Sequence, residues 1–281
     1  MSNDVRGAPV PLEWKSAVML LILSVAGLAM FAWPLIWSGG QSAPTAGAPV
    51  AFIVLLPMLV FLVMAQISER GMDAKALAIL GVLSAVNAAL RPLGAGTNGV
   101  ETVFFLLILA GRVFGPGFGF VLGCTSLFAS AVLTAGVGPW MPFQMLASAW
   151  IGMGAGLLPR KVFGRVIGGK WEVALLVAYG IVVAYLYGAL MNLWFWPYMM
   201  GPAMGDGTDL SYIPGGSPWA NLTRFFWYNL ITSAAVWDTG RAITNTVLIL
   251  LVGAPVLAVL RRTIRRANFN PAVEFNGERA L

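Results

Sequence analysis

Apolar runs of about twenty residues recur along the whole chain, and they limit what it can fold into. Runs such as 14–37, 171–196 and 239–260 are long enough to cross the roughly 30 Å of hydrocarbon in a bilayer as helices. Only helices and closed barrels span lipid, and strands of about ten alternating residues do not occur here. The sequence, 59% hydrophobic and 10% charged, therefore predicts an all-α polytopic membrane protein.

The residue types exclude several kinds of chemistry. The chain has no histidine and one cysteine, Cys124, inside an apolar run. Zinc, haem and iron–sulfur sites, disulfides and Ser-His or Cys-His nucleophiles therefore lack the residues they need. We expect no metal, no cofactor and no His-dependent catalysis, whereas a carboxylate-only or lipid-modifying enzyme stays open.

Basic residues indicate how the chain is oriented. The net charge of +6 in a membrane protein reports orientation more often than a nucleic-acid partner, so we expect no nucleic acid. With both termini cytoplasmic and eight spans, the 17 Lys and Arg all lie at or beyond cytoplasmic ends except Arg91, Arg224 and Arg241. The expected spans are about 14–37, 49–67, 76–90, 101–113, 120–135, 140–158, 171–196 and 239–260.

A charged break at 68–75 divides the chain into unequal parts. Residues 1–68 form a polar tail and two helices, and the first helix is too long for a cleavable signal, so we expect it to be retained. Residues 69–266 form a six-helix core with a long outer segment at about 197–237, and 267–281 form a cytoplasmic tail. Within the outer segment, 223–236 is expected as an aromatic helix at the interface that either continues into the last span or breaks before it.

Three polar and aromatic breaks of the last six helices fall on the external face in this topology. They are RPLGAGTNG at 91–99, the Gly-Pro-Trp elbow GVGPWMPFQ at 136–144, and the segment 197–237. Ligand sites combine apolar walls with a few convergent polar groups, so we expect the three breaks to form one mouth. The candidate substrate-binding residues in these breaks and beside them are Arg91, Thr97, Asn98, Trp140, Phe143, Gln144, Trp194 and Tyr198.

Each of these residues also has a structural explanation. Arg91 could snorkel to the interface, and Thr97 with Asn98 could form only a turn. The elbow could be an ordinary helix entry, although an amide one turn inside an apolar helix, as at Gln144, needs a hydrogen-bond partner. Trp194 and Tyr198 suit an aromatic belt, or they stack on a flat ligand.

Three polar residues recur on one face of the last span. Asp238, Arg241 and Asn245 lie at i, i+3 and i+7, so a helix places them together and the carboxylate is positioned to pair with the guanidinium. Charges within a span are costly unless they pair or line a cavity. The set is either a structural ion pair that locks the helix to a neighbour, such as the one bearing Glu101, or a direct ligand contact.

Small residues mark two further helix faces. Gly81, Ala85 and Ala89 repeat at four-residue spacing on the helix 76–90, a pattern that lets another helix approach closely. That neighbour belongs either to the same chain or to a separate membrane subunit. The glycines at 115, 117, 119 and 123 follow no strand, so we assign them to tight helix packing and not to dinucleotide binding.

From about 76 to 266 the chain resembles the substrate-binding S component of energy-coupling factor (ECF) vitamin transporters. The similarity lies in ALAILGVLSAVNAALR, RPLGAGTNG, GRVFGPGFGFVLG, GPWMPFQMLASAWIGMGAGLLP and DTGRAITN, and the elbow is the most specific of these. The two helices before residue 68 are additional to the usual six-helix core. Among these components the sequence looks more like the cobalamin-type ones than the thiamin or biotin binders, and its long aromatic outer segment suits a large ligand.

The resemblance implies a non-enzymatic subunit of an ABC-type importer in a prokaryotic cell membrane. A vitamin would bind between the outer loops, and Gly81, Ala85 and Ala89 would dock on a coupling (T) subunit that works with two cytoplasmic ATPases. The chain has no Walker A motif, as expected if its partners hydrolyse ATP. Two alternatives remain: a lipid-modifying membrane enzyme with Asp238 or Glu101 as general base, and a structural subunit without a ligand.

Overall fold

The computed structural model describes residues 12, 14–36, 72, 74–94, 99–199 and 209–267, together with most of 54–65. Five of its helices are long and apolar enough to cross a membrane: Trp14–Phe31, Ala74–Gly94, Pro116–Leu133, Lys170–Tyr198 and Pro218–Arg266. An all-helical, polytopic membrane protein is therefore confirmed. The eight-span topology with cytoplasmic termini stays a prediction, and the expected span 49–67 lies largely outside the described residues.

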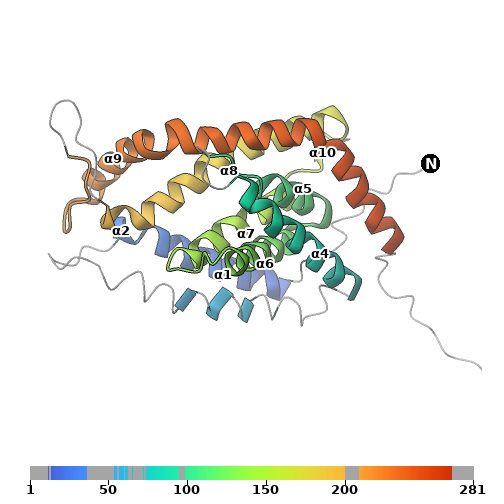
Figure 1. The fold of residues 1–281 in the computed structure, drawn as a ribbon, viewed down its shortest axis with the longest axis horizontal. Helices are drawn as coiled ribbons and strands as arrows, with labels where there is room; N and C mark the ends of the chain where they lie inside the picture. Colours follow the sequence, from blue (N-terminus) through green and yellow to red (C-terminus); the bar gives the residue numbers. More distant parts are fainter. Residues whose placement is uncertain are drawn as a thin grey trace, which may run out of the picture.

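The helices run in the order shown in Figure 1. Their bounds are α1 (Trp14–Phe31), α2 (Trp33–Ile36), α4 (Ala74–Leu90), η1 (Arg91–Gly94), α5 (Phe104–Phe114), α6 (Pro116–Leu133), α7 (Met141–Leu157), α8 (Lys170–Phe195), η2 (Trp196–Tyr198), α9 (Pro218–Asn229), η3 (Leu230–Asp238) and α10 (Thr239–Ala267). Between α7 and α8 the strands β1 (Lys161–Val162) and β2 (Arg165–Val166) form an antiparallel hairpin. We call the end of the molecule that carries α9 the α9 end, and the opposite end, with the strands, the hairpin end (Figure 1).

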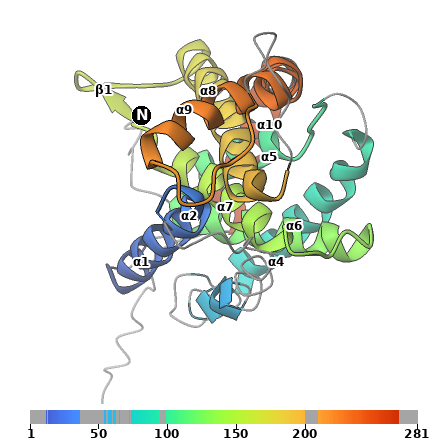
Figure 2. The same ribbon diagram turned by 90° about the vertical axis from the view of Figure 1, so that its left-hand side faces the viewer.

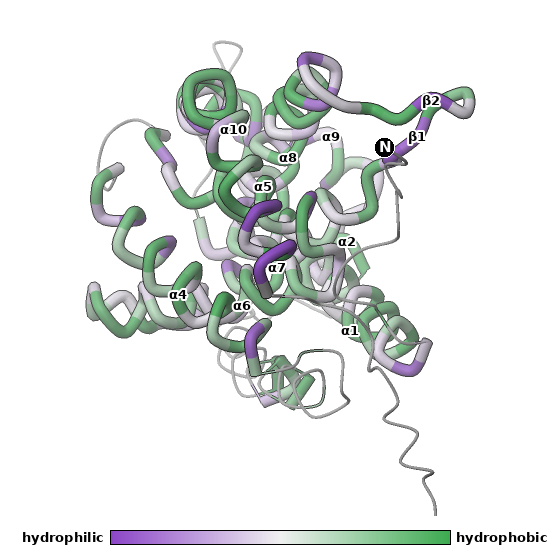
Figure 3. Tube along the Cα trace, turned by 90° about the vertical axis from the view of Figure 1, so that its right-hand side faces the viewer, coloured by the Kyte–Doolittle hydropathy of each residue, from purple (hydrophilic) through white to green (hydrophobic). Residues whose placement is uncertain are grey.

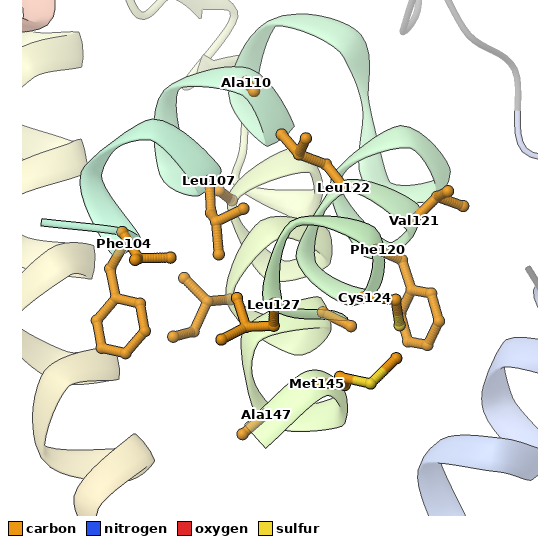
Figure 4. Close-up of a cluster of buried hydrophobic side chains, with 14 of the residues drawn as sticks. Phe104, Leu107, Ala110, Phe120, Val121, Leu122, Cys124, Leu127, Met145 and Ala147 are labelled. Carbon is orange, nitrogen blue, oxygen red and sulfur yellow. The ribbon is translucent and has the colours of Figure 1, made fainter. Parts of the chain in front are cut away.

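The core is built around α5, which is buried along its whole length. At 1.5 Å per residue its eleven residues extend about 17 Å, less than the roughly 30 Å of bilayer hydrocarbon, so the span expected at 101–113 is present as a short apolar helix. Leu107 and Ala110 of α5 pack beside Leu122 and Leu127 of α6 (Figure 4). Gly115, with φ of +110°, separates the two helices, and Pro116 begins α6 at a position that needs no backbone donor.

Glycine allows α6 and α7 to approach to backbone contact. A Cβ on Gly152 of α7 would overlap the carbonyl group of Gly119 in α6, and a Cβ on Gly123 would overlap the backbone of Ala149. Close approach through small residues increases packing between membrane helices. The assignment of Gly119 and Gly123 to tight helix packing is thereby confirmed.

The segment 218–267 forms one continuous helical rod against α8 (Figure 1). Its middle part, η3, is a nine-residue π-helix. Of the two alternatives for 223–236, the helix therefore continues into the last span and does not break before Asp238. π-Helical turns are rare and often occur at functional sites. Pro255 lies inside α10, where proline removes a backbone hydrogen bond and bends the helix, and the red end of α10 turns away from the rod in Figure 1.

The first helix packs on the core at α7 and α8 (Figure 2). Trp150 of α7 donates from Nε1 to Ser24 Oγ at 2.9 Å, and the ring of Phe31 lies edge-on to Phe143 at 5.0 Å. Trp33 donates from Nε1 to the carbonyl oxygen of Trp194 at 3.0 Å. The additional N-terminal helix is therefore fixed to the core on a side other than the exposed face of α4.

Candidate functional site

The turn after α4 is joined to the elbow by a side-chain hydrogen bond. Arg91 Nη2 donates to Gln144 Oε1 at 2.8 Å, so the amide one turn inside α7 has the partner that its position requires. Trp140 precedes α7, donates from Nε1 to the carbonyl oxygen of Gly136 at 3.2 Å, and keeps 41% of its surface exposed. This hydrogen bond joins two of the three predicted breaks, 91–99 and 136–144.

The same turn also contacts the end of the π-helix. Gly99, with φ of +79°, lies so close to the backbone of Trp237 that a Cβ would overlap its carbonyl group. Thr102 Oγ1 donates to the carbonyl oxygen of Leu90 at 2.6 Å and closes the turn from the other side. The predicted site residues Thr97 and Asn98 lie outside the described residues.

Glu101 lies between two arginines that come from different helices. Burial raises the pKa of its carboxyl group, and the positive charges of Arg241 and Arg91 oppose that shift. We call Arg91, Glu101, Gln144, Asp238 and Arg241 the two-arginine cluster. Its members come from η1, the loop before α5, α7, η3 and α10, so it forms only when these elements pack together.

The predicted pairing of Asp238 with Arg241 is confirmed. Arg241 Nη1 donates to Asp238 Oδ1, and Ser233 Oγ donates to the same oxygen at 3.0 Å. The carboxylate is fully buried against α8, where a Cβ on Gly188 would overlap it. The guanidinium carbon of Arg241 also lies 5.2 Å from the centre of the Tyr187 ring, a cation–π contact.

Asn245 lies about one helical turn beyond Arg241 on α10. Its Nδ2 donates to the carbonyl oxygen of Gly180 at 3.1 Å, and the side chain is fully buried. Asn192 donates to Asn229 Oδ1 at 2.7 Å toward the α9 end. Polar contacts therefore run along the whole seam between α8 and the rod, and Asn245 belongs to this seam at a distance from the elbow.

The aromatic candidates are largely packed against one another. Phe143 and Trp194 are 1% and 2% exposed, and their rings stack 4.2 Å apart at an angle of 2°. Tyr198 lies 6.0 Å from the Trp33 ring and is half-buried. Of these predicted aromatic residues, Trp140 has the most exposed side chain, whereas Phe143 and Trp194 are buried in a stacked pair.

The third arginine on this side belongs to the outer segment. Arg224 of α9 donates to the carbonyl oxygen of Asp209. Asp209 accepts hydrogen bonds from the backbone and the hydroxyl of Ser211, which hold the pKa of its carboxyl below the usual range. Trp196, Phe225 and other aromatic residues pack nearby in a small second core. The described part of the segment 197–237 thus forms a cap at the α9 end.

The face predicted for docking is open among the described residues. Gly81, Ala85 and Ala89 of α4 are all exposed, and a Cβ on Gly81 would meet no described atom within 4 Å. The opposite face of α4 is fixed to α6, where Ser84 and Thr125 hydroxyls lie 2.7 Å apart and Asn87 Nδ2 donates to Ser126 Oγ at 3.0 Å. The small residues are therefore unused by packing within the described part of the chain.

A second charged group at the hairpin end was not predicted. Glu172 of α8 accepts from Arg112 Nε at 2.9 Å and from Arg261 Nη2 at 2.7 Å, and Arg112 also donates to the carbonyl oxygens of Leu158 and Pro159. We call Arg112, Arg160, Glu172 and Arg261 the hairpin-end cluster. It joins α5, the end of α7, α8 and α10. Within the described ranges, no group of three or more His, Cys, Asp or Glu is placed to hold a metal ion.

Comparison with known families identifies the family of this chain. The family model described as ECF transporter, substrate-specific component, matches residues 75–253. That range includes the two-arginine cluster, the elbow and the exposed face of α4, and it begins after the additional N-terminal helices. No curated protein and no solved structure matches significantly.

Proposed function

We propose, since the chain belongs to the family of substrate-specific components of ECF transporters, that it captures a vitamin at its α9 end. In this proposal the loaded protein docks on a membrane coupling subunit, and two separate cytoplasmic ATPases drive delivery. Members of the family are transporter subunits and not enzymes, and this chain is a membrane protein.

The observation that carries the proposal is the two-arginine cluster. Charged side chains inside a helical membrane protein are costly and generally mark ion or substrate pathways. Here Arg91 and Arg241 both act on the carboxyl group of Glu101, Arg91 is hydrogen-bonded to Gln144 of the elbow, and the elbow's Trp140 is 41% exposed. Polar groups beside an aromatic wall suit a ligand with a flat apolar part and hydrogen-bonding substituents.

A corrinoid is the first vitamin to test. The reason is the resemblance of the sequence to cobalamin-type components, together with the long outer segment that forms the cap at the α9 end. Because Phe143 and Trp194 are buried and stack on each other, with Phe31 of α1 packed against Phe143, a ligand would contact Trp140 and the cluster first.

The binding test needs no ATP and no partner. Purified protein is titrated by calorimetry with a vitamin panel that includes cobalamin. The variants Gln144→Ala and Trp140→Ala are each expected to lower the affinity for the bound vitamin at least tenfold. Trp171→Ala is the matched control, since Trp171 is 79% exposed at the start of α8 and should leave affinity unchanged. Unchanged affinity in both elbow variants would refute the assignment of the elbow.

Docking is tested separately on the exposed face of α4. Ala85→Trp adds a large side chain to the small-residue face and is expected to abolish co-purification with the coupling subunit while vitamin binding persists. Ala235→Trp, at an exposed position of η3, is the control. If Ala85→Trp still co-purifies as the control does, the coupling subunit docks elsewhere.

The enzyme alternative has no supporting observation in this geometry. A general base must reach its substrate, whereas the carboxylate of Asp238 is fully buried and its Oδ1 accepts from Arg241 and Ser233. Loss of turnover of a lipid in Asp238→Asn, with vitamin binding intact, would favour the enzyme. A purely structural subunit would show no rise in melting temperature with any vitamin of the panel.

A further inference from the structure

A half-open groove lies between the beginning of α8 and the last part of α10. Its volume is about 580 Å³, within the usual range for sites that hold a small molecule. Most of its wall is aliphatic or glycine, and Lys170, Glu172 and Arg261 lie at one end. The lining residues are Gly169, Lys170, Glu172, Val173, Ala174, Leu250, Ala254, Leu257, Ala258 and Arg261.

The polar end of the groove carries more positive than negative charge. Among the described residues of the hairpin-end cluster, Arg112, Arg160 and Arg261 surround one carboxylate, that of Glu172. Burial lowers the pKa of the Arg160 guanidinium, the charges of Arg112 and Arg261 lower it further, and Glu172 opposes the shift. Lys170 adds an exposed ammonium group, so an anion at this end would relieve repulsion.

The bend in α10 brings basic side chains to the same end. Beyond Pro255 the end of α10 turns away from the rod (Figure 1), and Arg261, with its side chain 45% exposed, forms an ion pair with Glu172. Figure 3 shows hydrophilic residues on β1 and β2 at the same hairpin end. Basic residues beside the end of a membrane helix attract anionic lipid headgroups.

We propose that this groove binds one anionic phospholipid, with its phosphate at Lys170 and Arg261 and one acyl chain along Val173, Ala254 and Ala258. The groove opens at the side of two candidate membrane spans, where the neighbouring medium is lipid. The apolar wall of the groove matches an acyl chain, and the cationic pair at its end matches the phosphate of the headgroup. In a bilayer the headgroup likewise lies at the end of the acyl chain. The site is separate from the two-arginine cluster and does not depend on the transported vitamin.

The headgroup contact is tested with lipids that differ only in charge. Full-length protein in detergent is incubated with phosphatidylglycerol or with phosphatidylcholine of the same acyl chains, and bound lipid is measured by native mass spectrometry. Phosphatidylglycerol should bind at least fivefold more tightly than phosphatidylcholine. The variant Lys170→Gln should lower the affinity for phosphatidylglycerol about fivefold, which is the effect of one basic residue at a membrane surface. Lys161→Gln on the hairpin makes the same change in net charge outside the groove and should have no effect.

The acyl-chain contact is tested with a variant that fills the groove. Ala258→Phe should reduce the binding of phosphatidylglycerol, whereas Val259→Phe, on the neighbouring exposed surface, should leave it unchanged. Equal binding of the two lipids, or equal loss in Lys170→Gln and Lys161→Gln, would overturn the proposal. Displacement of phosphatidylglycerol by inorganic phosphate together with full binding to Ala258→Phe would also overturn it, because it would indicate an anion site without an acyl chain.

Discussion

Replacing Glu172 by glutamine tests whether the hairpin-end cluster holds the helices together. The Arg112 and Glu172 side chains are 3% and 4% exposed, so the variant leaves a buried guanidinium without its negative partner. Loss of one member of a buried ion pair costs about 3–5 kcal/mol. At about 2 °C per kcal/mol for a chain of this size, the melting temperature should fall by roughly 6–10 °C.

The measurement is thermal unfolding followed by tryptophan fluorescence, in one detergent, at one protein concentration and without ligand. Asp209→Asn is the matched control, because its exposed carboxyl contacts only local groups among the described residues, and the melting temperature should not change. The double variant Arg112→Met with Glu172→Met should be more stable than Glu172→Gln, since no buried charge is left alone.

The reasoning would be refuted if Glu172→Gln melted within about 2 °C of the wild type, because a loss of 3 kcal/mol or more cannot give so small a shift. It would also be refuted if the double variant were no more stable than the single one. The comparison stays informative when Glu172→Gln fails to fold, since recovery of folded protein in the double variant supports the same conclusion.

Three further predictions concern packing. Gly152→Ala forces a Cβ into the backbone of Gly119 and should destabilise the protein by about 1–3 kcal/mol, seen as a lower melting temperature. Gly81→Ala, on the open face of α4, should raise stability by about 0.5–1 kcal/mol in the same assay, and a fall would mean that the face is occupied. Trp33→Phe removes the hydrogen bond to the Trp194 carbonyl and should cost about 1 kcal/mol, with faster proteolysis of the N-terminal helix than in wild type.

Local spacing predicted part of the candidate site. The i, i+3 arrangement of Asp238 and Arg241 fixes a pair within one helix, so their contact could be derived before any packing was known. The need of a buried amide for a partner indicated that Gln144 would be bonded, but not that Arg91 would supply the donor from another helix. Contacts within one element follow from the sequence, whereas those between elements need the fold.

The hairpin-end cluster shows why the remaining contacts were missed. Arg112 and Arg261 are 60 and 89 positions away from Glu172, and each lies near a helix end where basic residues are expected for orientation alone. Nothing local distinguishes these arginines from their neighbours at the helix ends that the sequence predicts to be cytoplasmic. Likewise, Phe143 and Trp194 have the composition of a ligand wall, and only the packing of α7 on α8 shows that they stack on each other.

The polar seam between α8 and the rod has a consequence for how the protein enters the membrane. Asp238, Arg241 and Asn245 would each be unfavourable in a helix that left the translocon alone, since an aspartate or arginine at mid-membrane costs about 2.5–3.5 kcal/mol. Helix α8 is synthesised first, and it offers the space at Gly188 and the carbonyl oxygen of Gly180. We therefore expect the last helix to insert against α8, which is already in place when the last helix is synthesised.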